Sequence, residues 1–144
     1  MIFCSKKIEF DAAHRIIGHT SGCQMVHGHR YVIELTFASN QLNSMGMVID
    51  FKEIKSRFKN WIDTHWDHNI ILHKNDEKLG QMISDYTGQQ PFYLEYNPTS
   101  ENLAHFLFHS VLKAVFKDAP EYIELCYSIQ VNETPTSNSC FRIL

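Results

Sequence analysis

The stretch HGHRYVIELTF at residues 27–37 alternates between two kinds of side chain with a period of two. Its odd positions carry His, His, Tyr, Ile, Leu and Phe, which share one face when the chain is an extended strand. The apolar face of this strand therefore begins with two histidines, His27 and His29. Residues 2–14 alternate in the same way, and their even-numbered face ends in His14. A hairpin of these two strands would bring three imidazoles together at one end of a sheet.

Helical and extended patterns alternate in the rest of the chain. Apolar residues recur at helical spacing after Asp50, which forms the pattern of a capping box with Glu53. A polar connection is predicted over 64–72. With a hairpin at each end, the chain is predicted to be an α+β protein, in which a four-stranded antiparallel sheet carries helices on one face. The sequence predicts helices from Asp50 to about residue 62, over 79–86 with an end at Gly88, and after Asn97-Pro98-Thr99 to about residue 116, and further strands over 91–96, 122–133 and 141–143.

The composition is that of an ordinary globular protein with an excess of histidine. Of 144 residues, 44% are hydrophobic and 20% charged, and a single domain over residues 1–144 is expected. The net charge of −3 argues against a broad nucleic-acid surface, and the short apolar runs argue against a membrane span. The first residues resemble neither a secretory signal nor a transit peptide, and four scattered cysteines favour free thiols in a reducing cytoplasm. Nine histidines remain to be explained.

His27-Gly28-His29 is the sharpest local motif. Residues two apart on a strand project from the same face, so both imidazoles can reach one ion. With His14 at the end of the neighbouring strand, three nitrogen ligands would leave a fourth position open, as in a catalytic zinc site. The alternative is a set of hydrogen-bonded or surface histidines, and the placement of His14 favours the metal site.

Cys23 lies four residues before His27, in a glycine-containing loop over 15–26. A thiol near a cation is readily deprotonated and can act as a base or a nucleophile. Three interpretations compete at this point: a fourth zinc ligand that would close the site, a catalytic base, or an inert cysteine. The residue pattern alone leaves them open.

Two carboxylates outside this motif are also candidates. Asp67 precedes His68, and such a pair is either a carboxylate that orients an imidazole for proton transfer or a polar loop. Glu133 continues the inward apolar face of a predicted strand, where an unpaired carboxylate is costly to bury. It therefore either lies in solvent at the open end of the sheet or accepts hydrogen bonds from a ligand. His105 and His109 share a polar helical stripe, which we interpret as a solvated face or a subunit contact rather than a metal site.

Taken together and in order, these residues resemble the 6-pyruvoyltetrahydropterin synthase family. The resemblance runs from residue 3 to about residue 143, nearly the whole chain. The three residues between Cys23 and His27 resemble the bacterial 6-carboxy-5,6,7,8-tetrahydropterin synthase branch, on the route to queuosine. The 6-pyruvoyl branch usually has a longer spacing, and a third branch has glutamate in place of the cysteine. The segments that carry the resemblance are Phe10-Asp11-Ala12-Ala13-His14, Cys23-x-x-x-His27-Gly28-His29, Val48-Ile49-Asp50-Phe51, Asp67-His68, Asn97-Pro98-Thr99-Ser100-Glu101-Asn102 and Glu133-Thr134.

The resemblance implies a lyase that converts 7,8-dihydroneopterin triphosphate to 6-carboxytetrahydropterin, acetaldehyde and triphosphate. It implies one zinc ion per subunit, with magnesium on the substrate triphosphate as a further expectation, and no nucleic-acid or membrane partner. Alternatives are a 6-pyruvoyltetrahydropterin synthase, which eliminates triphosphate only, and a non-catalytic zinc- or pterin-binding protein. Carried over by position, His14, His27 and His29 match the zinc ligands, Cys23 the catalytic base, Asp67 and His68 a proton relay, and Glu133 the anchor of the pterin ring.

The resemblance also implies the tunnelling fold. In that fold, the sheets of several subunits join into a barrel, usually a hexamer of two trimers, with sites at the subunit interfaces. Cys23 or His68 would then serve a site that is shared with a neighbouring chain, in a cytoplasmic homo-oligomer. Cationic groups near the relevant segments, and so candidates for the triphosphate, are Lys6, Lys7, Arg15 and His19.

Overall fold

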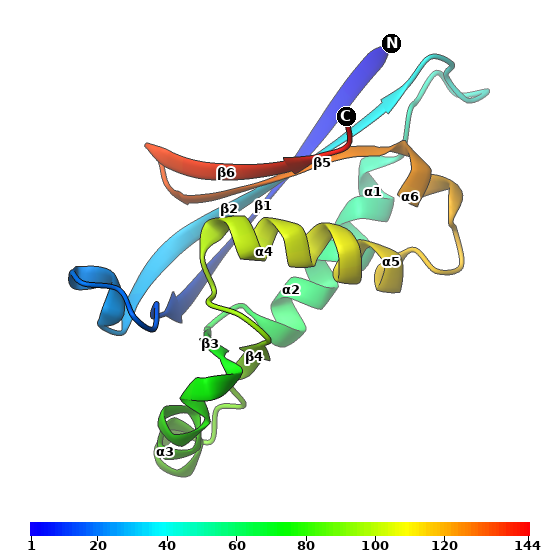
Figure 1. The fold of residues 1–144 in the computed structure, drawn as a ribbon. Coiled ribbons are helices and arrows are strands. Elements are labelled where there is room, and N and C mark those ends of the chain that lie inside the picture. Colours follow the sequence, from blue (N-terminus) through cyan, green and yellow to red (C-terminus); the bar gives the residue numbers. More distant parts are fainter.

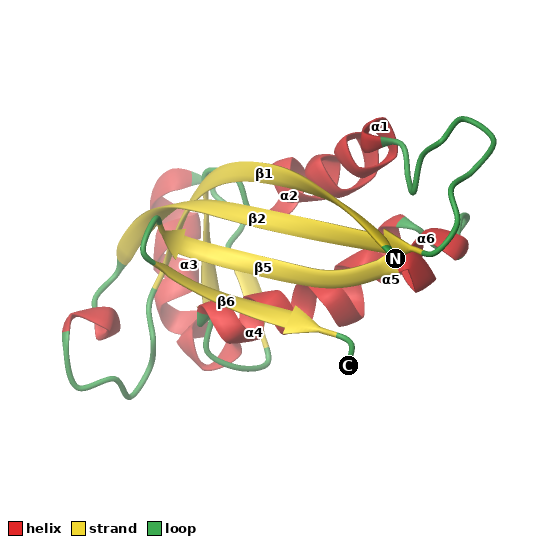
Figure 2. Ribbon diagram, turned by 90° about the horizontal axis from the view of Figure 1, so that it is seen from above, coloured by secondary structure: helices red, strands yellow, loops and turns green.

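A computed structural model describes all 144 residues as one curled sheet with helices packed against one of its faces (Figures 1 and 2). The sheet has six strands in the order β4-β3-β1-β2-β5-β6. The chain is therefore α+β, as predicted. The strands are β1 (Ile2–His14), β2 (His27–Ser39), β3 (Asn69–His73), β4 (Phe92–Leu94), β5 (Cys126–Thr134) and β6 (Ser137–Arg142).

The β1–β2 hairpin is the centre of the fold and confirms the predicted alternation. The two strands pair antiparallel along their whole length, with Ile2 opposite Ser39 and His14 opposite His27. Even positions of β1 and odd positions of β2 point into the core, where Tyr31 and Ile33 are fully buried. This register places the histidines of both strands at the same end of the sheet.

The prediction of a four-stranded antiparallel sheet is wrong. Two short strands extend the sheet beyond β1: β3 pairs parallel with β1, and β4 pairs parallel with β3. The sequence predicts a polar connection over 64–72, whereas the structure has β3 there. The strand is hard to predict because polar residues precede a run of only three apolar side chains. Those three, Ile70, Ile71 and Leu72, are all buried, and a strand covered on both faces shows no alternation. The edge strand predicted over 91–96 is confirmed by β4.

The helices mostly follow the predicted periodicity. α1 (Phe51–Ile54), a π-helical segment (Lys55–Lys59) and α2 (Asn60–His65) form one continuous helix. Asp50 caps its first turn through the Lys52 N–H, but Glu53 bonds to Arg57 rather than completing the predicted capping box. α3 (Glu77–Thr87) ends at Gly88, as predicted, and α4 (Ser100–Phe106), a second π-helical segment (Leu107–Val111) and α5 (Leu112–Val115) form the last long helix.

The predicted start of the fifth strand is wrong by four residues. Residues 122–125 belong to a short helix, α6 (Glu121–Leu125), which follows Pro120, and the strand begins at Cys126. Proline is favoured at the beginning of a helix because its backbone angle is already set for one. Ile123 and Leu125 are only partly buried against the core. They lie two residues apart, like the inward residues of the strand that follows, and this coincidence extends the strand pattern back to residue 122.

The core and the edges of the sheet position the site. A cluster of 26 buried residues fills the space between sheet and helices. β3 pairs with β1 only at Ala12–His14, so the edge of β1 over residues 2–11 has no strand beside it. The outermost strands of the sheet are β4 on the side of β1 and β6 on the opposite side. None of the helices combines the length and apolar composition needed to cross a membrane.

Candidate functional site

Three histidines converge at one end of the β1–β2 hairpin, as the alternation predicts. His14 is the last residue of β1, and His27 and His29 lie on the same face at the start of β2. The centroids of their rings are 4.6 Å (His14–His27), 5.1 Å (His14–His29) and 4.9 Å (His27–His29) apart. One nitrogen atom from each ring lies within 4.8 Å of the others, which is close enough for one ion to contact all three.

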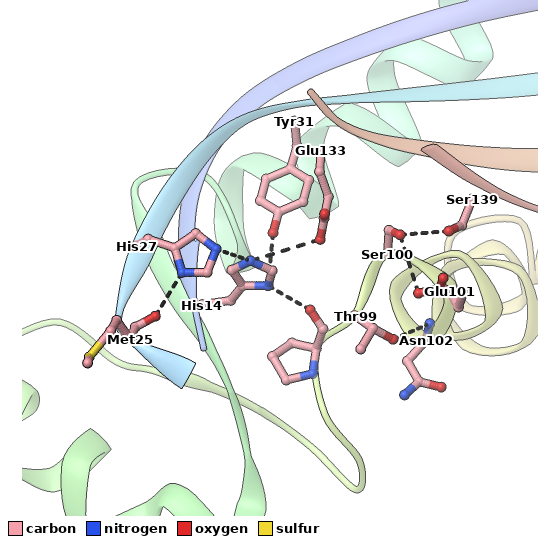
Figure 3. Close-up of polar contacts among 11 residues, drawn as sticks. His14, Met25, His27, Tyr31, Thr99, Ser100, Glu101, Asn102, Glu133 and Ser139 are labelled. Atoms are coloured by element: carbon pink, nitrogen blue, oxygen red, sulfur yellow. Dashed lines mark hydrogen bonds and ion pairs between the residues drawn. The ribbon is translucent and has the colours of Figure 1, made fainter. Parts of the chain in front are cut away.

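Hydrogen bonds on the far side of two rings set their tautomers (Figure 3). His14 Nδ1 lies 2.7 Å from the Pro98 carbonyl oxygen, and His27 Nδ1 lies 2.7 Å from the Met25 carbonyl oxygen. A carbonyl only accepts, so each Nδ1 carries a proton and donates. Each Nε2 then presents a lone pair, and these two Nε2 atoms are 3.1 Å apart. Two ring nitrogens this close to each other fit a shared cation, and backbone-oriented imidazoles are typical of zinc ligands.

Burial keeps two of these imidazoles, His14 and His29, in the neutral form. Burial lowers the pKa of His14 to about 4, against the opposing effect of the Pro98 carbonyl. It also lowers the pKa of His29, although the Glu133 carboxylate acts in the opposite direction. Burial and the charge of Glu133 raise the pKa of Tyr31, whose hydroxyl lies 3.1 Å from His14 Nδ1. At neutral pH His14 and His29 are therefore uncharged and Tyr31 is protonated.

Glu133 and Cys23 face the same cleft as the three histidines. The cleft encloses about 360 Å³. Glu133 lies on β5, with Oε1 3.9 Å from His14 Nε2, and its side chain is 24% exposed. Cys23 is exposed in a single 3₁₀ turn, Gly22–Gln24, of the loop between β1 and β2. A thiol, a carboxylate and three imidazoles thus line one opening, a set able to bind a metal and move protons on a bound ligand.

Several polar residues that line this cleft have no role predicted from the sequence. Ser100 Oγ, in the first turn of α4, lies 2.6 Å from Ser139 Oγ on β6. The Asn-Pro-Thr-Ser-Glu-Asn segment is part of the family resemblance, but no local pattern in the sequence predicts that β6 lines the cleft. The lining residues that the sequence argument missed are Ile16, Thr99, Ser100, Glu101, Ser137, Asn138 and Ser139.

Asp67 and His68 form a pair but lie outside this cleft. His68 Nδ1 is 3.0 Å from Asp67 Oδ1, which also accepts a hydrogen bond from the Asp11 N–H at 3.1 Å. Burial acts to raise the pKa of Asp67, but the Asp11 N–H and the His68 ring outweigh it, so the pKa is below its usual value. His68 has a φ of +56°, a strained backbone conformation for a residue other than glycine, and its side chain is 78% exposed. Neither residue lines the cleft that holds Cys23.

His105 and His109 lie on the exposed face of the last long helix. Their ring centroids are 4.3 Å apart, and both rings pack against Phe141 of β6. The predicted polar stripe thus covers part of the outermost strand, away from the cleft.

Asn97 fastens the Cys23 loop to the rest of the site. Its Oδ1 accepts from the Ile17 N–H at 2.9 Å, and its Nδ2 donates to the Ile17 carbonyl at 3.0 Å. The neighbouring Ile16 N–H donates to the Cys23 carbonyl at 2.8 Å. The next residue after Asn97 is Pro98, whose carbonyl orients His14. One short segment therefore positions both the thiol loop and a histidine.

Replacing Asn97 with aspartate is expected to loosen this loop. The carboxylate can accept from Ile17 but cannot donate, so the Ile17 carbonyl loses its partner, at a cost of about 1–3 kcal/mol. We expect kcat/KM to fall about tenfold or more and Cys23 to be alkylated faster, with metal content unchanged. Peptide mapping after iodoacetamide treatment measures the alkylation, and Asn60→Asp, at an exposed position on α2, is the matched control. Equal alkylation rates in both variants would contradict the positioning role.

Comparisons with known proteins agree with this architecture. The sequence profile of a family described as 6-pyruvoyl tetrahydropterin synthase matches residues 3–142. A 6-carboxy-5,6,7,8-tetrahydropterin synthase of Rickettsia typhi is 45% identical over 141 residues, covering 98% of each chain. An uncharacterised protein of Wolinella succinogenes superposes with a TM-score of 0.78 at 20% identity, covering 98% of this chain and 97% of that one.

The 6-pyruvoyl tetrahydropterin synthase of Caenorhabditis elegans superposes with a TM-score of 0.68 at 20% identity, covering 99% of this chain and 96% of that one. At this identity the likeness concerns the fold. The family match, in contrast, spans nearly the whole sequence and includes every residue of the cleft described above. The chain therefore belongs to the 6-pyruvoyl tetrahydropterin synthase family.

Proposed function

We propose that this protein is a tetrahydropterin synthase, and specifically a zinc-dependent 6-carboxy-5,6,7,8-tetrahydropterin synthase. The observation that carries the proposal is the single cleft that holds His14, His27, His29, Cys23 and Glu133. The name of the Rickettsia relative, which matches over almost the full length, supports the choice of product. The reaction would convert 7,8-dihydroneopterin triphosphate and water to 6-carboxytetrahydropterin, acetaldehyde and triphosphate, in cytoplasmic 7-deazapurine (queuosine) biosynthesis.

The three histidines are the proposed zinc ligands, with one ion per subunit. The uncharged state of His14 and the 3.1 Å distance between His14 Nε2 and His27 Nε2 support this assignment. Zinc bound there would act as a Lewis acid towards oxygen atoms of the substrate side chain. Magnesium on the substrate triphosphate is a further proposal, based on the chemistry of oligophosphates.

The other residues of the cleft have complementary proposed roles. Glu133 would accept hydrogen bonds from N–H groups of the pterin ring and so fix its orientation, since a carboxylate offers two acceptor oxygens. Cys23, as a thiolate, would take a proton from a carbon of the substrate side chain. Asp67 would orient the His68 ring through Nδ1, so that the remaining ring nitrogen can exchange a proton with substrate or thiol.

We further propose that each site is completed by a neighbouring chain. The cleft lies at the β6 edge, through Ser137 and Ser139, whereas Asp67 and His68 lie beside the uncovered edge of β1. Uncovered strand edges readily pair with other chains. Pairing of β1 with β6 of a second copy would join the sheets into a barrel and bring the relay of one chain towards the thiol of the next. A hexamer of two trimers is the proposed assembly.

A second candidate function is 6-pyruvoyltetrahydropterin synthase, which is the description of the matching family and of the Caenorhabditis elegans neighbour. It uses the same elimination of triphosphate but keeps the side-chain carbons. The three-residue interval between Cys23 and His27 favours the 6-carboxy reaction.

Product analysis distinguishes the two reactions. The purified protein, loaded with zinc and supplied with magnesium, is incubated with dihydroneopterin triphosphate, and both fragments are identified by mass. We expect acetaldehyde and 6-carboxytetrahydropterin in equal amounts. Accumulation of a 6-pyruvoyl product without acetaldehyde would support the second function, and binding without release of triphosphate would overturn both.

A further inference from the structure

A cleft of about 400 Å³ beside Asp67 and His68 gathers positive charge. Five of the 13 lysine and arginine residues of the chain line it, although the net charge of the whole protein is −3. Only two acidic side chains, Glu9 and Asp67, share the lining. The cationic residues are Lys6, Lys7, Arg30, Lys55 and Lys59.

Two elements of the fold form the walls of this cleft. Lys6 and Lys7 lie on the part of β1 that has no neighbouring strand, and Lys55 and Lys59 lie on the π-helical segment between α1 and α2. Figure 2 shows this helix beside the β1 edge of the sheet. Lys55 and Lys59 are spaced by four residues, which places them on neighbouring turns of one helix face. The positive charges therefore come from opposite sides of one opening.

Two of these lysines have no counter-ion within the chain. Lys59 pairs with Asp63 at 2.6 Å, Lys7 lies 3.8 Å from Glu34, and Arg30 bonds to Asp11 at 2.9 Å. No carboxylate oxygen lies within 4.0 Å of Nζ of Lys6 or Lys55. Like charges that face one cleft repel each other, and they form a site that attracts a multiply charged anion. Lys6 and Lys55 are therefore the residues best placed to bind one.

We propose that this cleft binds the triphosphate group of the pterin substrate. The inference rests on the proposed function, in which Asp67 and His68 act at the site of a neighbouring chain. The cleft adjoins that pair, so the same subunit contact that brings His68 to a neighbour's thiol also brings Lys6 and Lys55 there. The pterin ring would lie on Glu133 of one chain and the triphosphate in the basic cleft of the next. Substrate binding would then require both subunits.

The test compares two double variants of the zinc-loaded protein. Lys6→Ala/Lys55→Ala removes the two unpaired charges, and Lys78→Ala/Lys117→Ala removes two exposed lysines elsewhere as the matched control. Inorganic tripolyphosphate is the probe, as a competitive inhibitor and as a ligand in calorimetry, at one fixed magnesium concentration. Unphosphorylated 7,8-dihydroneopterin reports on the pterin subsite alone.

We expect Lys6→Ala/Lys55→Ala to raise KM for the triphosphate substrate, and Ki and Kd for tripolyphosphate, at least about tenfold, with kcat within about twofold. Binding of dihydroneopterin should not change, and the control variant should resemble wild type. The inference is overturned if tripolyphosphate binds both variants equally, or if dihydroneopterin binding weakens as much as tripolyphosphate binding. Calorimetry separates the two proposals: a wild-type protein that makes no product refutes the proposed function, while its affinity for tripolyphosphate still tests the cleft.

Discussion

Replacing His29 with alanine is expected to abolish zinc binding and turnover together. Of the three proposed ligands, His29 is the one whose removal should disturb the fold least, because its ring is only partly buried and forms no hydrogen bond within the chain, whereas His14 and His27 each bond to a backbone carbonyl. Loss of groups that merely support a ligand costs about 10–100-fold in metal affinity, so loss of the ligand itself should cost more than about 100-fold. Because the Lewis acid contributes several kcal/mol, kcat should fall about 10³-fold or more.

Metal content by mass spectrometry and steady-state kinetics measure these two losses. The control is His105→Ala, at an exposed position on α4 outside the cleft, which should keep one zinc per chain and wild-type turnover. Chelation of wild type should reproduce the His29→Ala kinetics, and added zinc should restore wild type but not the variant. Full zinc occupancy in His29→Ala would exclude this residue as a ligand.

The sequence alone predicts the candidate site residues that share one face of a strand. The alternation of β1 and β2 predicts that His14, His27 and His29 share a face, and the observed register places His14 opposite His27. Glu133 follows from the same argument, since a carboxylate on an inward face needs a solvent opening or a partner. Both predictions depend only on strand periodicity, which is a local property.

The parts that sequence reasoning missed depend on contacts between distant segments. β3 was hidden because it is short and buried on both faces, and it joins the sheet through only three residues of β1. The two hydrogen bonds between the Asn97 side chain and the Ile17 backbone join residues 80 positions apart, and no local sequence pattern predicts them. The separation of Asp67 and His68 from Cys23 is of the same kind: the motif predicts the residue types, whereas the chain fold decides which cleft each one lines.

Two inactive variants should restore each other's activity when mixed, if each site is shared between chains. Cys23→Ala removes the proposed base and His68→Ala the proposed relay, and each should lower kcat about 10²–10⁴-fold, the usual range for a general acid–base group. Co-expressed with different tags and purified by both, they form mixed oligomers. The His68→Ala chain still carries Cys23, and the Cys23→Ala chain still carries His68. A shared site is therefore intact when a His68→Ala chain supplies Cys23 and a neighbouring Cys23→Ala chain supplies His68.

With random mixing at equal amounts, about one site in four meets this condition, so activity should recover to about a quarter of wild type. If Cys23 and His68 of the same chain acted together, every site would lack one group and the mixture would stay at the level of the single variants. The matched control combines Cys23→Ala with the double variant Cys23→Ala/His68→Ala, which can form no intact site under either arrangement. Recovery is expected because His68 is 78% exposed and lines clefts at the β1 side of the sheet, whereas Cys23 opens into the cleft at the β6 edge. A contact between chains would bring these two groups to one substrate, which is the arrangement that the mixing experiment tests.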